Sequence, residues 1–338
     1  MKNKNKGNGN IGLNSSYKRV KPDDSDYIYI PIIGTNNIQG NFYQKIKDDP
    51  IYKTGGIEYL SRYINILRNE FGKNRVLYFD AGEYYNKSIK EESNKIEEFF
   101  NYIDLKATIL NETENQEYLE KIYNRSYSLL SSKTENYKLY KTKLINGDII
   151  TIGIIGLTIE KNENYNLTEL IIKLELFSNN LKNNGVDAII LLTNLDIQCV
   201  GKELKLNMFH NDKQFCDVHY KSNRIIFDIL NNSGNILDAV IASNSNNFEM
   251  HHWENNIPIM SSPSNGKYFN IMYLPFKKKD NKYILYNNEI KIEGPIPICE
   301  KIFNDTQICD DEIPSKTKNL INYSWHDRKI TKDKNFNF

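Results

Sequence analysis

Short apolar runs alternate with amphipathic helical segments through most of the chain, and five of these runs end in a cluster of polar residues. The run from Tyr27 to Ile33 is followed at 57–71 by apolar residues at helical spacing. The run at 186–192 is almost wholly apolar, which is typical of a strand covered on both faces. A hairpin is predicted at 138–157, with Asn146-Gly147 as a two-residue turn. This alternation predicts an α/β fold with a mixed sheet, arranged as two sheets faced by helices.

The remaining elements follow from the same patterns. Additional strands are expected at 75–79, 107–110 and 237–242, and additional helices at 96–105, 167–181 and 220–232. Strands at 257–261, 268–275 and 283–292 are expected to form a closing antiparallel set.

Composition divides the chain into three parts. Residues 1–26 are polar, rich in Asn and Lys, and predicted to be a disordered tail. Residues 27–285 carry the alternating pattern and form the predicted domain. Residues 286–338, with a weak helix near 315–323, are expected to be an extension packed on that domain.

The charge balance excludes several classes of function. The 338 residues include 44 basic and 43 acidic side chains, for a net charge of +1, so no basic surface for nucleic acid or an anionic membrane is expected. No apolar run reaches the length needed to span a bilayer. The basic start of the chain is not followed by an apolar region, so a cytoplasmic location is expected, with secretion only if the N-terminus is incomplete.

Cysteine and asparagine usage add two expectations. The four Cys residues are too few and too scattered for a disulfide framework. Cys299 and Cys309 are close enough in sequence to be bridged, although free thiols are the expectation. Asparagine is unusually frequent and accompanies Lys, Ile and Tyr, which is typical of an A/T-rich genome. Sequons therefore arise by chance, and no glycosylation is expected.

Five polar clusters occur where predicted strands end, which is where open α/β folds place functional loops. They are Gly34-Thr35-Asn36-Asn37-Ile38-Gln39-Gly40, Asp80-Ala81-Gly82-Glu83, Asn111-Glu112-Thr113-Glu114, Thr193-Asn194-Leu195-Asp196 and Ser243-Asn244-Ser245-Asn246. Between them stand Thr54-Gly55-Gly56-Ile57, Ile152-Gly153-Ile154-Ile155-Gly156-Leu157-Thr158, Gly185-Val186-Asp187-Ala188-Ile189-Ile190 and Gly266-Lys267-Tyr268.

In order and spacing these segments, over about residues 27–300, resemble the 5′-nucleotidase/UDP-sugar hydrolase family of calcineurin-like dinuclear metallophosphoesterases. That resemblance implies a sandwich of two mixed β-sheets flanked by helices. It also implies two divalent metal ions held by seven side chains, with a histidine beside them as general acid. The positions that match the metal ligands are Asn37, Gln39, Glu83, Glu112, Asn194, Asn244 and Asn246, and Thr113 stands at the general-acid position.

None of the eight functional residues of the family is present at these positions. Carboxamides are neutral, are weak ligands, and cannot act as acids or bases near pH 7. Two divalent ions side by side need anionic ligands to offset their repulsion. We therefore expect no bound metal pair, no cofactor and no catalytic residue.

Two alternatives at the site remain open. In the first, Glu83 and Glu112 form, with the Asn and Gln side chains at the other ligand positions, an oxygen-only set of ligands that suits a weakly held Ca²⁺ or Mg²⁺. In the second, which is the expectation, these side-chain amides hydrogen-bond one another and no cation is bound. The adjacent His251 and His252 are expected in a loop. They would take the places of the absent metal ligands only if the match to the family's motif were shifted along the sequence. Cys216 and His219 are neighbours without the wider constellation that a thiol enzyme needs.

The sequence thus predicts a catalytically inactive metallophosphoesterase domain with a binding or structural role, acting as an accessory subunit for a protein partner or larger assembly. The alternative is an active, metal-dependent nucleotide or phosphoester hydrolase with a rebuilt metal site that uses Glu83, Glu112 and His251 or His252. Loops at 246–256 and 286–312 are the expected contact surfaces.

Overall fold

The computed structural model describes most of the chain. The described residues are 19–23, 26–42, 45–46, 53–86, 88, 90–109, 125–131, 135–159, 165–196, 198–199, 221–222, 225–243, 251–304, 309 and 319–333. Among them no helix is long and apolar enough to cross a bilayer.

The first sheet has the strand order β16-β15-β1-β4-β5-β6, with β17 also paired to β15. Strands β1, β4, β5 and β6 run parallel to one another, while β15 is antiparallel to β1, β16 and β17. The bounds are β1 Ile28–Thr35, β4 Leu77–Asp80, β5 Ala107–Ile109, β6 Ser128–Leu130, β15 Tyr268–Lys279, β16 Lys282–Leu285 and β17 Lys291–Pro297.

The second sheet has the order β13-β14-β12-β9-β8-β7. Strands β8, β9, β12 and β14 are parallel, and the edge strands β7 and β13 are antiparallel to their neighbours. The bounds are β7 Tyr137–Lys143, β8 Ile149–Leu157, β9 Ala188–Asp196, β12 Ala239–Ser243, β13 His251–Glu254 and β14 Ile257–Ser261. Both sheets are therefore mixed, as the sequence predicts.

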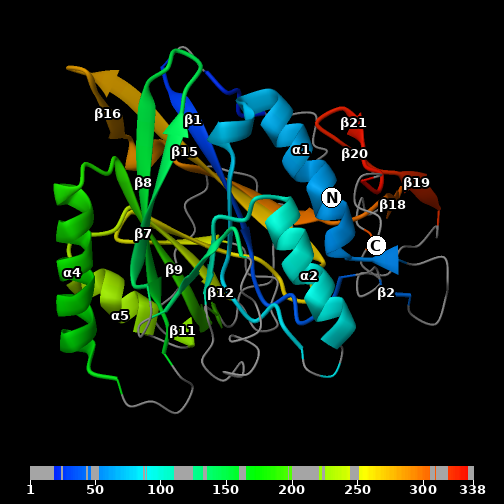
Figure 1. Ribbon diagram of the computed structural model, residues 1–338, viewed down its shortest axis with the longest axis horizontal. Helices are drawn as coiled ribbons and strands as arrows, with labels where there is room; N and C mark the ends of the chain where they lie inside the picture. Colours follow the sequence, from blue (N-terminus) through cyan, green and yellow to red (C-terminus); the bar gives the residue numbers. More distant parts are fainter. Residues whose placement is uncertain are drawn as a thin grey trace, which may run out of the picture.

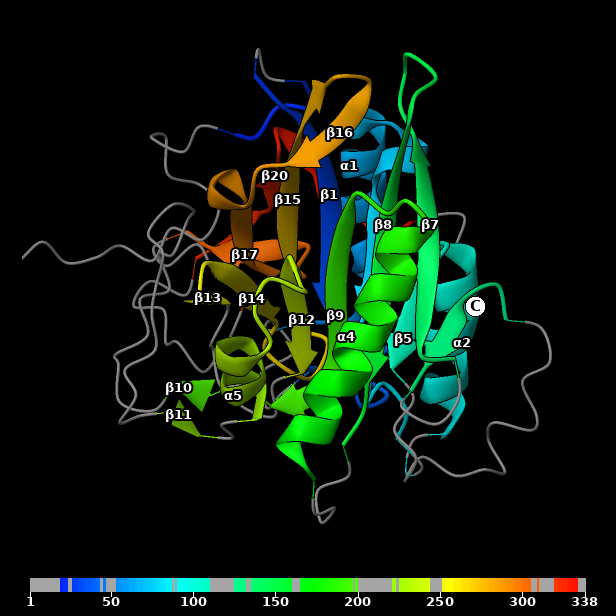
Figure 2. The same cartoon turned by 90° about the vertical axis from the view of Figure 1, so that its left-hand side faces the viewer.

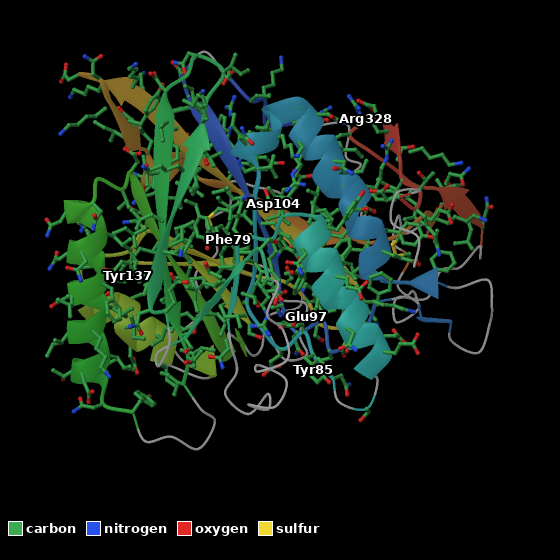
Figure 3. The ribbon with its side chains drawn as sticks, viewed as in Figure 1. Phe79, Tyr85, Glu97, Asp104, Tyr137 and Arg328 are labelled. Carbon is green, nitrogen blue, oxygen red and sulfur yellow. A yellow bond between two sulfur atoms is a disulfide. The ribbon has the colours of Figure 1, made fainter. Side chains whose placement is uncertain are left out.

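The two sheets pack face to face through an apolar layer that includes Ile32 and Phe79 from the first and Ile152 and Ile190 from the second. Phe79 is labelled in Figure 3. Helices α1 (Leu60–Phe71) and α2 (Lys90–Tyr102) cover the outer face of the first sheet, and α4 (Leu167–Asn183) and α5 (Ile225–Asn232) cover the second. Figure 1 shows the two helix pairs on opposite sides of the molecule, and in Figure 2 α4 lies along β8 and β9. The fold is thus a four-layered α/β sandwich.

Short elements complete the structure. They are β2 Lys45–Ile46, β3 Lys53–Thr54, β10 Gln198–Cys199, β11 Lys221–Ser222, β18 Lys301–Phe303, β19 Leu320–Asn322, β20 Ser324–Trp325, β21 Arg328–Lys329, and the 3₁₀ turns η1 Ile57–Tyr59, η2 Lys73–Arg75 and η5 Asn287–Glu289.

Three local expectations were wrong. Beyond the Lys143–Ile149 pair of the β7–β8 ladder, the Leu144 amide donates to the carbonyl oxygen of Asp148 at 2.8 Å, so three residues, 145–147, rather than two, make the turn. Strand β14 is parallel to β12, so the last strands are not all antiparallel. The predicted strand 283–292 is two strands, β16 and β17. The Tyr286 amide still donates to the carbonyl oxygen of Pro275 in β15 at 3.0 Å, and the 3₁₀ turn η5 that follows separates the two strands.

The described structure begins before the expected start of order. Val20, inside the predicted disordered tail, is 4% exposed and belongs to the outer core. The buried guanidinium of Arg75 donates to the carbonyl oxygens of Pro22 (2.8 Å) and Tyr29 (3.0 Å) and pairs with Asp23 at 3.0 Å. A buried cation needs such acceptors, so this arginine orders the segment. The expected tail over residues 1–18 lies outside the described residues.

The C-terminal boundary also differs from the expectation. Strand β17 pairs with β15 in the first sheet, so residues 291–297 belong to the domain, and the packed segment begins after them rather than at residue 286. Cys299 and Cys309 form a disulfide with a Cα–Cα separation of 6.3 Å, instead of the expected free thiols. The weak helix expected near 315–323 is absent from the described part of that range, where 320–322 form β19.

Candidate functional site at the strand ends

Two loops that follow β1 and β4 lie side by side and are joined by main-chain hydrogen bonds. The amide of Asn37 donates to the carbonyl oxygen of Gly82 at 2.8 Å, and the amide of Gln39 donates to that of Glu83 at 2.9 Å. Gly40 donates to Tyr84, and Ala81 donates to Thr35, both at 2.8 Å. We call residues 35–40 and 81–84 the paired loops. Three of the predicted ligand positions, Asn37, Gln39 and Glu83, are therefore brought together.

These three residues share an uncommon backbone conformation. Their φ angles are 49° for Asn37, 49° for Gln39 and 57° for Glu83, all in the left-handed region. Non-glycine residues there carry a strain of about 1–2 kcal/mol, which Asn tolerates best. The main-chain hydrogen bonds between the paired loops hold this conformation. Asn37 is buried, Glu83 is half-buried, and Gln39 is exposed.

A further hydrogen-bonded contact joins the two sheets at the same edge. The side-chain oxygen of Asn36 accepts from the amide of Ser262 at 2.9 Å, and the Ser262 hydroxyl donates to the carbonyl oxygen of Gly34 at 2.9 Å. Ser262 directly follows β14, so the ends of β1 and β14 are tied across the sandwich. The carboxyl ends of both sheets consequently meet at one place.

Asp80 is a buried, strongly perturbed carboxyl group beneath the paired loops. Its carboxylate is fully buried and accepts from the Thr35 hydroxyl (2.7 Å), the Gly82 amide (2.9 Å) and the Thr108 hydroxyl (3.0 Å). The Tyr78 hydroxyl lies 2.6 Å from that of Thr35. Burial raises the pKa of Asp80 to about 7, although the three donors favour its ionised form. In the sequence Asp80 is part of the matching segment Asp80-Ala81-Gly82, and its position directly after the apolar run 76–79 is the signal that could have indicated a buried carboxyl group.

A buried ion pair supports the second paired loop from outside. The Tyr84 hydroxyl donates to Glu97 of α2 at 2.6 Å, and Glu97 lies 3.6 Å from the Arg125 guanidinium. Glu97 is labelled in Figure 3. No sequence pattern indicates these contacts, because Glu97 is 13 residues from Tyr84 and 28 from Arg125, and none of the three belongs to a motif.

The other predicted site residues are only partly described. Asn194 is half-buried inside β9, which continues to Asp196, so it does not lie at the strand end as expected. Glu112, Thr113, Asn244 and Asn246, together with Cys216 and His219, lie outside the described residues. His251 and His252 lie on strand β13 rather than in the expected loop, and His251 is paired with Met260 near the end of β14.

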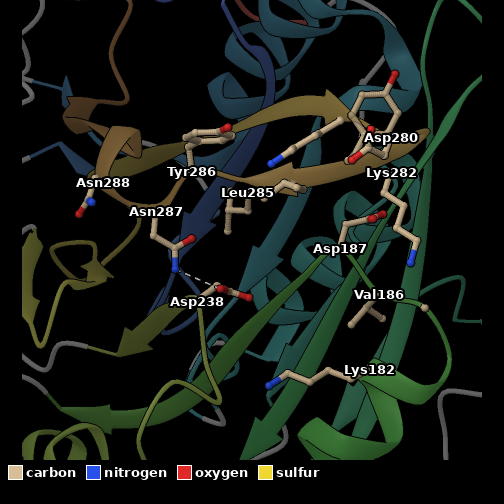
Figure 4. Close-up of a pocket in the computed structure, with 14 residues that line it drawn as sticks. Lys182, Val186, Asp187, Asp238, Asp280, Lys282, Leu285, Tyr286, Asn287 and Asn288 are labelled. Atoms are coloured by element: carbon tan, nitrogen blue, oxygen red, sulfur yellow. Dashed lines mark hydrogen bonds between the residues drawn. The ribbon is translucent and has the colours of Figure 1, made fainter.

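A cleft of about 1110 Å³ lies at the opposite edge of the sandwich, between the β15–β16 hairpin and the starts of β9 and β12 (Figure 4). Asp187 and Asp238 line it, and each accepts from an amide of the neighbouring strand, at 2.7 Å from Thr151 and 2.8 Å from Ile189. Burial raises the pKa of both carboxyls. These aspartates fix strand register and are remote from the paired loops.

Comparison with known proteins identifies the fold. No protein-family model matches the chain, and no curated protein matches it in sequence. A calcineurin-like phosphoesterase from Bacillus subtilis superposes with a TM-score of 0.58 at 16% identity, over 80% of this chain and 91% of that one. This chain has the calcineurin-like phosphoesterase fold.

Two longer proteins share this fold. A putative 5′-nucleotidase from Staphylococcus aureus matches with a TM-score of 0.54 at 12% identity, over 84% of this chain and 56% of that one. The NAD nucleotidase of Haemophilus influenzae matches with a TM-score of 0.50 at 14% identity, over 77% and 49%. The chain spans about half the length of these two. The resemblance seen in the sequence is therefore confirmed at the level of the fold.

The left-handed backbone at Gln39 yields a test of its strain. Gln39→Gly should raise the free energy of unfolding by about 0.5–1 kcal/mol, since glycine relieves the left-handed strain, and the greater freedom of the unfolded chain offsets part of that gain. Urea unfolding measures this. Asp280→Gly, at an exposed turn residue with φ of 49°, is the matched control and should gain as much. A loss of stability at Gln39 alone would show that its side chain makes a stabilising interaction.

Proposed function

We propose that this chain is a catalytically inactive member of the calcineurin-like phosphoesterase fold with a binding or structural role. The observation that carries the proposal is the pair of loops: their backbones are held together, while the three described ligand positions on them are Asn37, Gln39 and Glu83. These offer two neutral carboxamides and one carboxylate. Among the described residues, moreover, no group of three or more His, Cys, Asp or Glu side chains is placed to hold a metal ion.

This donor set does not fit a pair of divalent ions. Imidazole and bridging carboxylate ligands supply most of the affinity for transition metals, and the described positions offer no imidazole. Mutation of outer-shell groups alone typically costs about 10–100-fold in metal affinity or activity, so loss of the direct ligands should cost more. A weakly held Ca²⁺ or Mg²⁺ at Glu83, with Glu112, stays part of the proposal because oxygen ligands suit hard cations.

Turnover assays test the proposal directly. The purified chain should hydrolyse neither AMP nor a generic aryl phosphate above the Glu83→Ala variant, with Mn²⁺, Zn²⁺, Ca²⁺ or Mg²⁺ supplied in turn. Titration calorimetry with the same ions should give either no heat or weak binding of one hard cation. Metal-dependent turnover that Glu83→Ala abolishes would refute inactivity.

The second candidate function is an active hydrolase with a rebuilt metal site. The position of His251 favours it, because this residue pairs with Met260 near the end of β14, at the edge where Ser262 meets Asn36. In that case His251→Ala and Glu83→Ala should each abolish turnover, while His326→Gln, a change in a histidine of the C-terminal segment, should not. Activity insensitive to His251 and His252 would remove this candidate.

A binding role predicts a stable partner. Affinity purification of the tagged chain from the source organism should yield a stoichiometric protein that co-elutes through gel filtration, and an unrelated tagged protein is the control.

A cytoplasmic location stays a proposal. A disulfide such as Cys299–Cys309 is rare in that compartment. Cell fractionation, with thiol labelling of the native protein, will decide between a cytoplasmic and a secreted location.

A further inference from the structure

The C-terminal segment 319–333, which we call the strap, crosses the outer face of α1. Trp325 packs against the rings of Tyr63 and Phe269, with centroids 5.3 and 6.1 Å away. Arg62 of α1 donates to the carbonyl oxygen of Lys329 at 3.3 Å, and Lys332 pairs with Glu58 at 2.9 Å. Figure 1 shows β20 and β21 of the strap beside α1, far in sequence from that helix.

His326 lies at the centre of this contact. Its side chain is 6% exposed and stacks on Trp325, with ring centroids 3.8 Å apart. Nδ1 is 3.0 Å from Glu70 of α1, and Nε2 is 3.8 Å from Glu293 of β17. The ring therefore stands between two carboxylates that are themselves only 10% and 2% exposed.

The charged and titratable groups around His326 come from every element packed against it. Glu70 also pairs with Arg19, which reaches towards the exposed Asp327 at 4.0 Å. Glu293 accepts from Tyr273 of β15 at 2.7 Å and from the Trp325 ring nitrogen at 3.3 Å. The Tyr323 hydroxyl is buried and interacts electrostatically with Glu293.

The charge of the buried group depends on one proton. With His326 protonated, Nδ1 donates to Glu70 at 3.0 Å, and the positive ring lies between two buried carboxyl groups, with Nε2 3.8 Å from Glu293. With His326 neutral, the positive charge between these acids is lost, and a ring nitrogen that holds no proton turns a lone pair towards a buried carboxyl group, which is unfavourable.

We propose that the strap is a proton-controlled clasp: it docks on α1 when His326 is protonated, and loosens when that proton is lost. The two carboxylates belong to the domain and the imidazole to the strap, so the proton is shared across the contact that must open. Because the strap holds Trp325 over Tyr63 and Phe269, its release uncovers an aromatic surface on the domain.

The direction of the pH effect follows from the titration of His326. Burial by itself lowers the pKa of this ring, but its interactions with Glu293 and Glu70 outweigh burial, so the pKa lies above 6.5. A raised folded-state pKa gives stability that is fully present below the unfolded value and lost as pH rises through the folded value. The clasp is therefore closed in weak acid and opens towards alkaline pH.

Hydrogen exchange with mass spectrometry on the full chain tests the clasp. Protection factors of residues 320–330 should fall by up to about tenfold for each pH unit between the unfolded-state and folded-state pKa values of His326, and level off above the latter, while those of β1 and β9 stay high. His326→Gln, whose amide cannot take up a proton, should remove this pH dependence. Lys332→Gln, which removes an exposed ion pair of the same strap, is the matched control and should keep it.

A second variant keeps the test informative if His326→Gln fails to fold. Glu293→Gln removes one of the two carboxyl groups beside His326 and should therefore move the pH midpoint of strap release to lower pH. The fluorescence of Trp325, measured in a Trp253→Phe background, reports this midpoint. Strap protection that does not change with pH in the wild type would overturn the proposal. An unchanged midpoint in Glu293→Gln, or an unchanged transition in His326→Gln, would overturn it as well.

Discussion

Replacing Asp80 with alanine should lower the free energy of unfolding by about 3–5 kcal/mol, because three buried donors lose their acceptor at once. The hydroxyls of Thr35 and Thr108 and the amide of Gly82 all donate to this carboxylate, and no solvent reaches it. The Gly82 amide belongs to the paired loops, so the strand-end site should lose its order together with the fold. Urea denaturation at neutral pH measures the loss.

Asp80→Asn is the matched control, since it keeps the shape and two acceptor sites while removing the titratable proton. It should cost about 1 kcal/mol or less at pH 7, where the carboxyl is already partly protonated. A loss as large as that of the alanine variant would mean that the ionised carboxylate itself stabilises the fold.

The same pair of proteins reveals the pH dependence. The pKa of Asp80 is raised to about 7 in the folded state, from an unfolded value of 3.8, so the folded protein holds an extra proton between these values. Stability should therefore fall by about 2–3 kcal/mol from pH 5 to pH 8 on account of this group. His326 acts in the same direction, and the difference between the wild type and Asp80→Asn isolates the share of Asp80.

Alanine at Gly156 should be the second strongly destabilising change, with a loss of about 2–3 kcal/mol. A Cβ atom there would lie 2.4 Å from the Cβ of Leu130 and 3.2 Å from its carbonyl carbon. Gly156 is in β8 of the second sheet and Leu130 is in β6 of the first, so the added methyl would force the two sheets apart. Thermal unfolding followed by circular dichroism measures the effect.

Gly153→Ala provides the comparison within the same strand. Its Cβ would meet the Cδ atoms of Leu181 at 2.9 and 3.0 Å, the far end of a side chain that can rotate away. A loss below about 1 kcal/mol is expected. Equal losses at the two glycines would show that the close approach of the sheets is not what requires Gly156.

Periodicity predicted the architecture well, because a buried strand or an amphipathic helix is encoded by its own residues. The β1, α1, β4 and α4 segments are therefore found close to their predicted positions. Pairing partners are not encoded locally, and the parallel placement of β14 beside β12 was missed for that reason. Pro22 and Asp23, in the segment that contains the buried Val20, contact Arg75 more than fifty residues away, and no local pattern reveals this.

The candidate site was predicted in part, for a similar reason. Asn37, Gln39 and Glu83 could be placed together because carboxyl ends of parallel strands share an edge. Their left-handed backbone, the Asn36–Ser262 contact and the fully buried Asp80 depend on tertiary contacts. Whether the site is chemically inert stays a prediction, since it concerns reactivity rather than position.

The main-chain pairing of the loops at 35–40 and 81–84 has an evolutionary consequence. Because peptide groups of the two loops, with Asp80 beneath them, hold positions 37, 39 and 83 together, their spacing does not require the side chains at these positions, and the left-handed backbone there favours Asn and Gly. Reactivity and foldability are thereby encoded separately on this scaffold. Designed side chains introduced at these three positions would therefore stand at a spacing that the main-chain hydrogen bonds already set.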